Sequence, residues 1–185
     1  MSTLAFLGAA GTGKTTKLMA ALETHLLSAP LGSDRRVLAL TRMHGSRHRL
    51  IERLRGTSAR DRFDCMTFDR FAWELTNRWR SLLRELGQGL LSEFDYDGTC
   101  DAGGRMLLAE HVAKWVVARY PITLVDEFQD CRDGRLAIVK ALAGQSDLLV
   151  AADEFQDLHG TGASDAVTWL RGAATVEELK TFHRT

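Results

Sequence analysis

Short runs of consecutive apolar residues alternate along the chain with longer stretches in which apolar residues recur every three or four positions. The short runs predict β-strands, because an unbroken apolar segment of this length suits a strand that is buried on both faces. These runs lie at residues 4–7, 37–41, 63–67, 122–125 and 148–151. Such strands are usual in parallel sheets, whose connections are helical, so the pattern indicates an α/β fold with helices on both faces of a parallel sheet.

The intervening stretches have the period of an α-helix. Leu18, Leu22 and Leu26 are spaced by four residues and would line one face of a helix that begins at Lys14. Further helices are expected over residues 46–55, 68–86, 105–119, 136–142 and 164–170.

Two segments fit either pattern poorly. Residues 87–104 are rich in glycine and acidic side chains, which predicts a flexible loop or the edge of a subdomain. In the helix expected after this segment, Leu108 would face inward with the next apolar residues. Residues 176–182 contain acids that suit a helix but could also form a last strand. We expect a single domain over residues 1–185, in which residues 73–120 form a small helical insertion.

The composition is that of a globular protein. Hydrophobic residues make up 45% and charged residues 26% of the 185-residue chain, which excludes a disordered tail, a collagen and a coiled-coil rod. The chain has 24 Lys and Arg residues and 24 Asp and Glu residues, so its formal net charge is zero. This balance excludes a strongly basic nucleic-acid coat protein. It leaves room for a basic groove on one face, because charges can segregate by face.

The three cysteines, Cys65, Cys100 and Cys131, are far apart and form no CxxC motif. This spacing disfavours a disulfide framework or a zinc site and fits the reducing cytoplasm, where we expect the protein to reside. No apolar run is long enough to span a bilayer, and the N-terminus lacks the basic segment of a signal peptide. We therefore expect no membrane partner.

A phosphate-binding motif follows the first predicted strand. Residues 8–15 match GxxxxGK[ST] and open a predicted helix, as this motif requires. Glycines let backbone N–H groups turn toward phosphate oxygens, and the helix N-terminus adds partial positive charge. Lys14 can reach the β- and γ-phosphates of ATP, and the Thr15 hydroxyl can bind Mg²⁺. The residues expected to bind the nucleotide are Gly8, Ala9, Ala10, Gly11, Thr12, Gly13, Lys14, Thr15 and Thr16.

A cluster of carboxylates follows the strand at residues 122–125. Asp126 is positioned to hold Mg²⁺, usually through water. Its neighbour Glu127 could accept a proton from an attacking water molecule. An acidic turn at the end of a strand would explain this cluster if it stood alone. Together with the phosphate-binding motif, it favours an ATP site.

These two motifs together resemble those of the first RecA-like domain of UvrD/Rep-like superfamily 1 DNA helicases. Residues 8–16 read GAAGTGKTT and residues 126–130 read DEFQD. Four further segments, in the order of the family, resemble the strand of motif Ia, the TFHSFA segment, the GDxxQ of motif III and the NYRS of motif IV. These segments are residues 37–41, 67–72, 152–156 and 182–185.

The resemblance implies a RecA-like P-loop fold, ATP and Mg²⁺ as ligands, and roles for matching residues. Gln129 would sense the γ-phosphate or orient water, and Gln156 would link the γ-phosphate to the DNA-binding surface. Arg184 would place a guanidinium on the γ-phosphate, where its charge stabilises the transition state. The implied partners are single-stranded DNA and a second RecA-like domain, in cis or in trans.

The chain departs from the family pattern at several points. The upstream glutamine motif that reads adenine has no counterpart, and the helical insertion is shorter than usual. Asp69 and His159 stand where the family commonly has His and Tyr. Four basic side chains could still hold DNA phosphates or could form a solvated helix face, namely those of Arg42, Arg47, His48 and Arg70. The four tryptophans are expected in the core or in subdomain contacts, namely Trp73, Trp79, Trp115 and Trp169.

The sequence thus favours the ATP-binding motor domain of a DNA helicase or translocase, with Lys14, Thr15 and Asp126 binding MgATP and Glu127 activating water. One alternative is a module that binds nucleotide and a partner without turnover. A P-loop kinase is a second alternative. It is disfavoured by the DEFQD segment and by the lack of an arginine-bearing lid.

Overall fold

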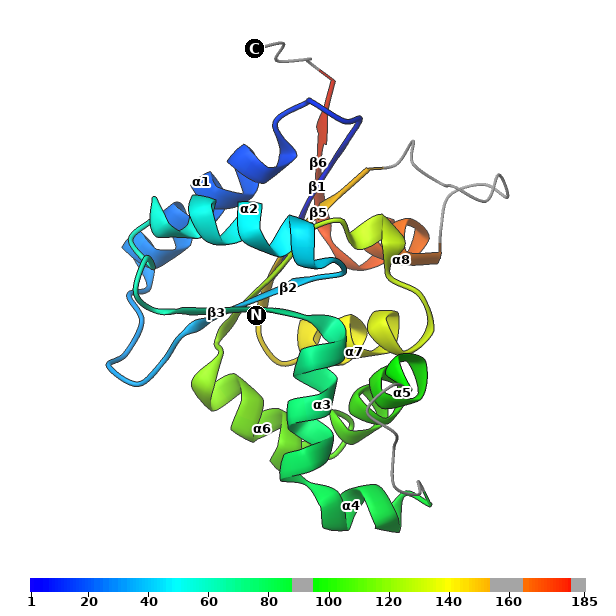
Figure 1. The fold of residues 1–185 in the computed structure, drawn as a ribbon. Coiled ribbons are helices and arrows are strands. Elements are labelled where there is room, and N and C mark those ends of the chain that lie inside the picture. The colour runs from blue at the N-terminus through cyan, green and yellow to red at the C-terminus, as the bar shows by residue number, and fades with distance from the viewer. Residues whose placement is uncertain (88–94, 154–164, 181–185) are drawn as a thin grey trace.

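The computed structural model of the chain describes residues 1–87, 95–153 and 165–180, without the side chain of His44 (Figure 1). The strands are β1 (Thr3–Gly8), β2 (Val37–Thr41), β3 (Phe63–Thr67), β4 (Ile122–Val125), β5 (Asp147–Ala152) and β6 (Thr175–Leu179). The helices are α1 (Lys14–Ser28), α2 (His44–Arg55), α3 (Phe68–Arg78), α4 (Arg80–Glu85), α5 (Tyr96–Met106), α6 (Glu110–Arg119), α7 (Asp133–Ala143) and α8 (Asp165–Ala173). A short 3₁₀ helix, η1 (Phe128–Asp130), follows β4.

The described strands form one six-stranded sheet in the order β3-β2-β4-β5-β1-β6. Every pairing is parallel, and β1 lies between β5 and β6. The α/β fold expected from the apolar runs is confirmed. Residues 176–179 of the ambiguous segment belong to a strand, β6, which pairs along its whole length with β1.

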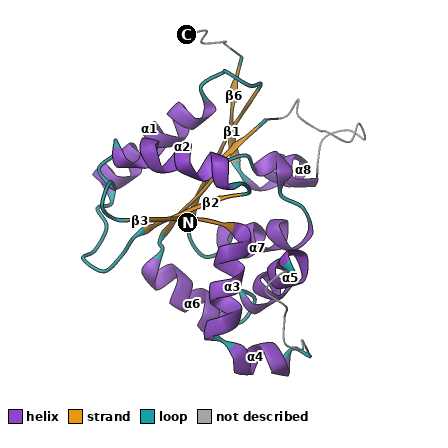
Figure 2. Ribbon diagram, in the orientation of Figure 1, coloured by secondary structure: helices purple, strands orange, loops and turns teal. Residues whose placement is uncertain are grey.

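Helices cover both faces of the sheet (Figure 2). Successive residues of a strand point to opposite faces, so Leu38 and Leu40 lie in one core while Val37 and Ala39 lie in the other. The second core is closed by α1 and α2, and the first by α3, α5, α6, α7 and α8. The stripe expected on the first helix is confirmed, since Leu18, Leu22 and Leu26 of α1 are all buried.

Of the two alternatives for the glycine-rich segment 87–104, a flexible loop is wrong for its second half, because α5 begins at Tyr96. Asp95 caps this helix by accepting a hydrogen bond from the Gly98 amide at 3.0 Å. The glycines of α5 permit close helix packing. A Cβ on Gly104 would lie 2.9 Å from the Ala137 Cβ on α7. Tertiary packing therefore outweighs the low helix propensity of glycine.

Two helix boundaries also differ from expectation. The helix expected over residues 68–86 is two helices, since the backbone of Trp79 leaves the helical region between α3 and α4. The helix expected over residues 105–119 is likewise interrupted, between Met106 and Glu110. Leu108 lies in this interruption and is 78% exposed, so the prediction that it faces inward was wrong.

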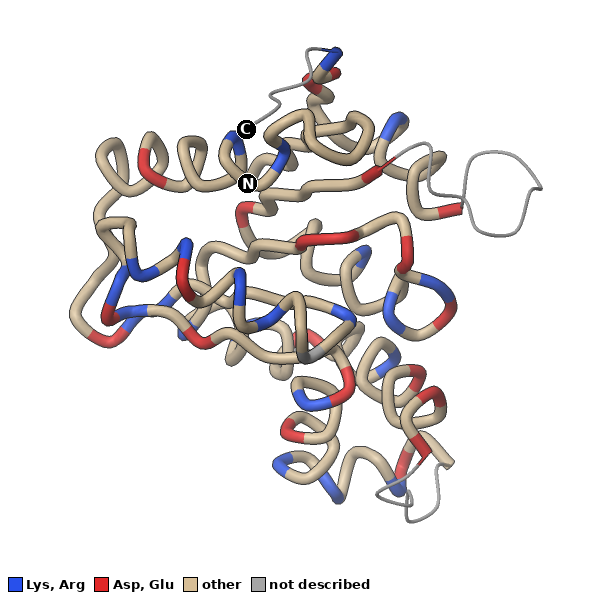
Figure 3. The backbone as a smooth tube through the Cα atoms, turned by 45° about the horizontal axis from the view of Figure 1, so that its top comes forward, with Lys and Arg blue, Asp and Glu red and all other residues tan. Residues whose placement is uncertain are grey.

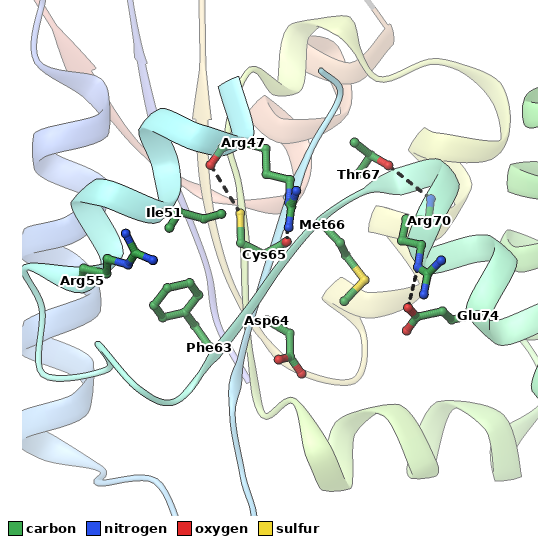
Figure 4. A pocket seen from close by; sticks show the side chains of 10 residues that line it. All are labelled: Arg47, Ile51, Arg55, Phe63, Asp64, Cys65, Met66, Thr67, Arg70 and Glu74. Atoms are coloured by element: carbon green, nitrogen blue, oxygen red, sulfur yellow. Dashed lines mark hydrogen bonds and ion pairs between the residues drawn. The ribbon is translucent and has the colours of Figure 1, made fainter. Parts of the chain in front are cut away.

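The edge strand β3 is covered by arginine side chains (Figure 4). The Cys65 carbonyl accepts a hydrogen bond from Arg47 Nε of α2 at 2.8 Å. The Phe63 carbonyl accepts one from Arg36 at 2.7 Å. Charged side chains on an edge strand oppose the addition of a further strand. The Arg47 bond also fixes α2 against the sheet.

All three cysteines are free and buried. Among the described residues, no helix is long and apolar enough to span a membrane.

We expect Gly134→Ala to lower the free energy of unfolding by about 1–3 kcal/mol, because overpacking forces backbone shifts. A Cβ on Gly134 of α7 would lie 2.5 Å from the backbone carbonyl carbon of Cys100 on α5. Urea denaturation measures the change. Gly172→Ala is the control, since a Cβ there meets nothing within 4 Å. Equal stability of the two variants would contradict close α5–α7 packing.

Candidate functional site

The candidate site lies where the carboxyl ends of three neighbouring strands meet. The loop that contains residues 8–15 follows β1, Asp126 follows β4, and Asp153 follows β5. β5 pairs with both β1 and β4. Parallel pairing therefore brings the phosphate-binding motif and the carboxylate cluster to the same edge of the sheet, where ligands bind in folds of this class.

The loop after β1 needs its glycines for conformation and for space. Gly11 and Gly13 have φ angles of 81° and 83°, which side chains other than glycine rarely adopt. A Cβ on Gly8 would lie 2.6 Å from the Leu179 carbonyl oxygen of β6. The Thr12 hydroxyl closes the turn by donating a hydrogen bond to the Ala9 carbonyl at 2.9 Å. The loop thus leads directly into α1, whose N-terminal amides favour an anion.

The Lys14 ammonium is held by three oxygen atoms. It donates hydrogen bonds to the Gly8 and Ala9 carbonyls at 2.7 and 2.8 Å and forms an ion pair with Asp153 at 3.3 Å. The side chain of Lys14 is 13% exposed and that of Asp153 is 3% exposed. Asp153 was not among the residues predicted from the sequence to act in the site.

The carboxyl group of Asp126 has an unusual proton affinity. Burial, and to a smaller extent the neighbouring Glu127 carboxylate, raise its pKa to about 6. The Glu127 amide and the positive charges of Lys14 and Arg53 act in the opposite direction. A carboxylate in this environment gains from a nearby cation, which agrees with the predicted metal-binding role.

Glu127 is oriented by its backbone and by Gln129. Its φ angle of 56° and ψ angle of 43° place it in the left-handed region, which costs energy for a non-glycine residue and is common at functional sites. The buried Gln129 side chain donates from Nε2 to Glu127 Oε2 at 2.6 Å. Its Oε1 accepts a hydrogen bond from the Asp153 amide at 2.8 Å. Gln129 therefore bridges the turn after β4 and the end of β5.

A cavity of about 110 Å³ opens beside these groups. Thr15, Asp126 and Glu127 line it together with Arg49 and Arg53 of α2. Both arginines were missed in the sequence, although the helical period of α2 places them on one face. The cavity brings the predicted metal-binding hydroxyl and both predicted carboxylates together.

These residues fit a magnesium ion that is bound together with phosphate groups. No group of three or more His, Cys, Asp and Glu side chains suited to a metal occurs among the described residues. Mg²⁺ is commonly held by only one or two protein oxygens together with phosphates and water. Thr15 and Asp126 supply that number at this cavity.

A second cavity, of about 510 Å³, lies beyond the carboxyl ends of β2 and β3. Arg42 and Arg70 line it as expected for a basic groove, together with Trp73, Tyr96 and Arg135. Trp73 is only partly buried, so of the two expected positions a subdomain contact fits it better than the core. Arg135 forms an ion pair with Asp69 at 2.7 Å. The position of Tyr96 and Arg135 depends on how α5 and α7 pack, which the sequence pattern does not reveal.

Several predicted residues lie elsewhere. Arg47 contacts the edge strand β3 instead of the second cavity, and His48 is exposed. Gln156, His159 and Arg184 lie outside the described residues.

The AAA domain family matches residues 1–161 of the chain. A segment of 65 residues is 36% identical to part of the RecBCD enzyme subunit RecB of Mycolicibacterium smegmatis. This segment is 35% of the present chain and 6% of that subunit, so the match spans a small fraction of the length of this relative. Both matches confirm the helicase-type ATPase resemblance indicated by the motifs.

The raised pKa of Asp126 predicts a pH-dependent stability. An acid whose pKa rises from 3.8 to about 6 on folding contributes stability that is fully present below pH 3.8 and is lost as the pH rises through 6. Asp126→Asn removes this loss. We expect its gain in the free energy of unfolding to be larger at pH 8 than at pH 5 by about 1 kcal/mol.

Urea denaturation in metal-free buffer at the two pH values measures this difference. Glu52→Gln, an exposed change on α2, is the control. An equal gain for Asp126→Asn at both pH values would contradict the assigned pKa.

Proposed function

Because this chain belongs to the AAA domain family, a family of NTPases, we propose that it is the ATP-binding motor domain of a superfamily 1 DNA helicase or translocase. In the whole protein, hydrolysis of MgATP would drive movement along single-stranded DNA. A second RecA-like domain, in cis or in trans, would supply the other wall of the nucleotide cleft. Residues 73–120 would form the reduced helical insertion of this single domain.

The observation that carries the proposal is the continuous set of contacts from the phosphate-binding loop to the predicted base. Lys14 contacts Asp153, the Asp153 amide contacts Gln129, and Gln129 contacts Glu127. Lys14, Gln129 and Glu127 belong to the two motifs that predict ATP hydrolysis, and Asp153 links them. The contacts between these side chains at one edge of the sheet support a site that transfers a phosphoryl group to water.

The roles of the side chains follow from their positions. Lys14 would exchange the two carbonyls and Asp153 for the β- and γ-phosphate oxygens of ATP. Glu127 would accept the proton of the attacking water, and Gln129 would hold the Glu127 carboxylate in place. Thr15 and Asp126 would hold Mg²⁺, which neutralises phosphate charge when it is bound. Gln156 and Arg184 remain proposed contacts of the γ-phosphate.

The second cavity supports single-stranded DNA as the partner. Arg42 and Arg70 offer positive charge for phosphates. Trp73 and Tyr96 offer rings on which bases can stack. The two types of side chain lie together at the ends of β2 and β3, on the same edge of the sheet as the nucleotide site.

Hydrolysis of ATP by the chain, with and without single-stranded DNA, tests the proposed reaction. Lys14→Ala should abolish both MgATP binding and hydrolysis, because it removes the phosphate-binding cation. Glu127→Gln should keep MgATP binding and lower hydrolysis by at least about a hundredfold, since general-base catalysis contributes about 10²–10⁴-fold. Binding is measured by calorimetry, and hydrolysis by phosphate release.

Unchanged hydrolysis in Glu127→Gln would remove this residue from the role of base. Binding of MgATP without any turnover would favour the nucleotide-dependent binding module. Phosphoryl transfer to an acceptor other than water would favour the kinase.

We expect Trp73→Ala to weaken binding of a fluorescent oligothymidylate by about tenfold, because stacking of a base on an aromatic ring is worth about 1–3 kcal/mol. Fluorescence anisotropy at a fixed salt concentration measures the affinity. Trp115→Ala is the matched control. Its ring is also partly buried, but it packs under the Arg78 guanidinium at 4.3 Å, outside this cavity. Equal losses in the two variants would contradict a DNA site at the second cavity.

A further inference from the structure

Helix α2 carries two separate stripes of arginine. Arg47, Ile51 and Arg55 are spaced by four residues and line a cavity at the β3 edge (Figure 4). Arg49 and Arg53, also spaced by four, line the nucleotide-side cavity instead. Positive charge accordingly recurs along the whole helix (Figure 3). The helical period therefore assigns each pair of arginines to a different surface.

The two arginines of the nucleotide-side stripe differ in what they contact. Arg53 donates a hydrogen bond to the Thr16 hydroxyl of α1 at 3.3 Å, one residue beyond the predicted metal ligand Thr15. Arg49 forms no hydrogen bond or ion pair within the part of the chain that the structure describes. Its guanidinium thus lies at a polar cavity with its donors available to a ligand.

The position of Arg49 along α2 indicates which part of a nucleotide it faces. α2 begins just beyond the end of β2, and the Asp126 amide donates a hydrogen bond to the Leu40 carbonyl of that strand at 3.3 Å. The early turns of α2 therefore lie near Asp126 and Glu127, where the terminal phosphate would react. Arg53 lies one turn later, where its charge acts on Asp126 and its side chain contacts the first turn of α1.

The local charge shows why a cation is needed at this position. Asp126 and Glu127 present two carboxyl groups to the cavity, and these groups repel the terminal phosphate of a nucleoside triphosphate. A guanidinium that lines the same cavity attracts the phosphate and offers two parallel donors to its oxygens.

We propose that Arg49 selects nucleoside triphosphate over diphosphate by binding the terminal phosphate from the α2 side of the cavity. The hydrogen bond from Arg53 to Thr16 positions α2, the helix that carries Arg49. This inference rests on the proposed function, because it assumes that MgATP occupies the loop after β1. It adds a contact to the phosphate from within this chain, besides that of Lys14.

The test compares the affinities of MgATP and MgADP by calorimetry in the full chain. Arg49→Gln should weaken MgATP binding by about tenfold, as expected for loss of a charge-assisted hydrogen bond. It should change MgADP binding by less than about twofold. Arg55→Gln is the matched control, because Arg55 lies on the other stripe and pairs with Glu52. It should leave both affinities unchanged.

Arg49→Lys provides a second variant that retains the charge but loses the planar pair of donors. It should lose part of the MgATP affinity and keep that for MgADP. Circular dichroism establishes that each variant is folded.

If Arg49→Gln lost MgATP and MgADP affinity equally, or lost neither, the inference would be overturned. The proposed function would stand, because the unaltered chain would still bind MgATP. Failure of the unaltered chain to bind either nucleotide would instead overturn the proposed function.

Discussion

A nearly buried ammonium group constrains the whole site. A charge that is removed from water requires partners, and Lys14 finds them in two carbonyls at the end of β1 and in the Asp153 carboxylate at the end of β5. Both sets of partners are available only if β1 and β5 are neighbours with their carboxyl ends level, as their register provides. Lys14 can therefore keep all its partners only when β1 and β5 are adjacent in the sheet.

From Lys14 the constraint extends through hydrogen bonds. Asp153 contributes its carboxylate to Lys14 and its amide to Gln129. Gln129 in turn fixes Glu127, whose left-handed backbone turns the carboxyl group back toward the site. A phosphate that displaced Lys14 from Asp153 would thereby act on a residue that is two contacts from Glu127. The coupling needs no large movement, because the linked groups are already in contact.

Much of the fold was predictable because buried parallel strands leave an unbroken apolar signal. Val37–Thr41, Phe63–Thr67 and Ile122–Val125 were predicted with the observed bounds. The errors arise where distant packing decides the local structure. α5 forms despite its glycines because α7 approaches closely, and Leu108 faces solvent because α5 and α6 are separate helices.

The candidate site divides in the same way. The loop after β1 and the pair Asp126 and Glu127 could be predicted, because each is a local motif with a fixed chemistry. Arg49 and Asp153 could not be assigned a function. Their importance depends on which side of α2 faces the sheet and on which strand lies beside β1. Both are properties of the assembled sheet, so the helical period at Arg49 and the motif around Asp153 do not by themselves show what these side chains contact.

The bond between Arg47 and the Cys65 carbonyl has a mechanical consequence. Successive residues of a helix are rotated by about 100° around its axis, so the anchor at Arg47 and the buried Leu50 and Leu54 together set the rotation of α2. A strand that added to β3 would compete with Arg47 for that carbonyl and would remove one of the contacts that set this rotation. Addition of a strand at β3 would therefore disturb the orientation of the Arg49 side chain toward the cavity. The Cys65 carbonyl at the edge of the sheet thus helps to fix the rotation of α2, the helix that lines the nucleotide-side cavity.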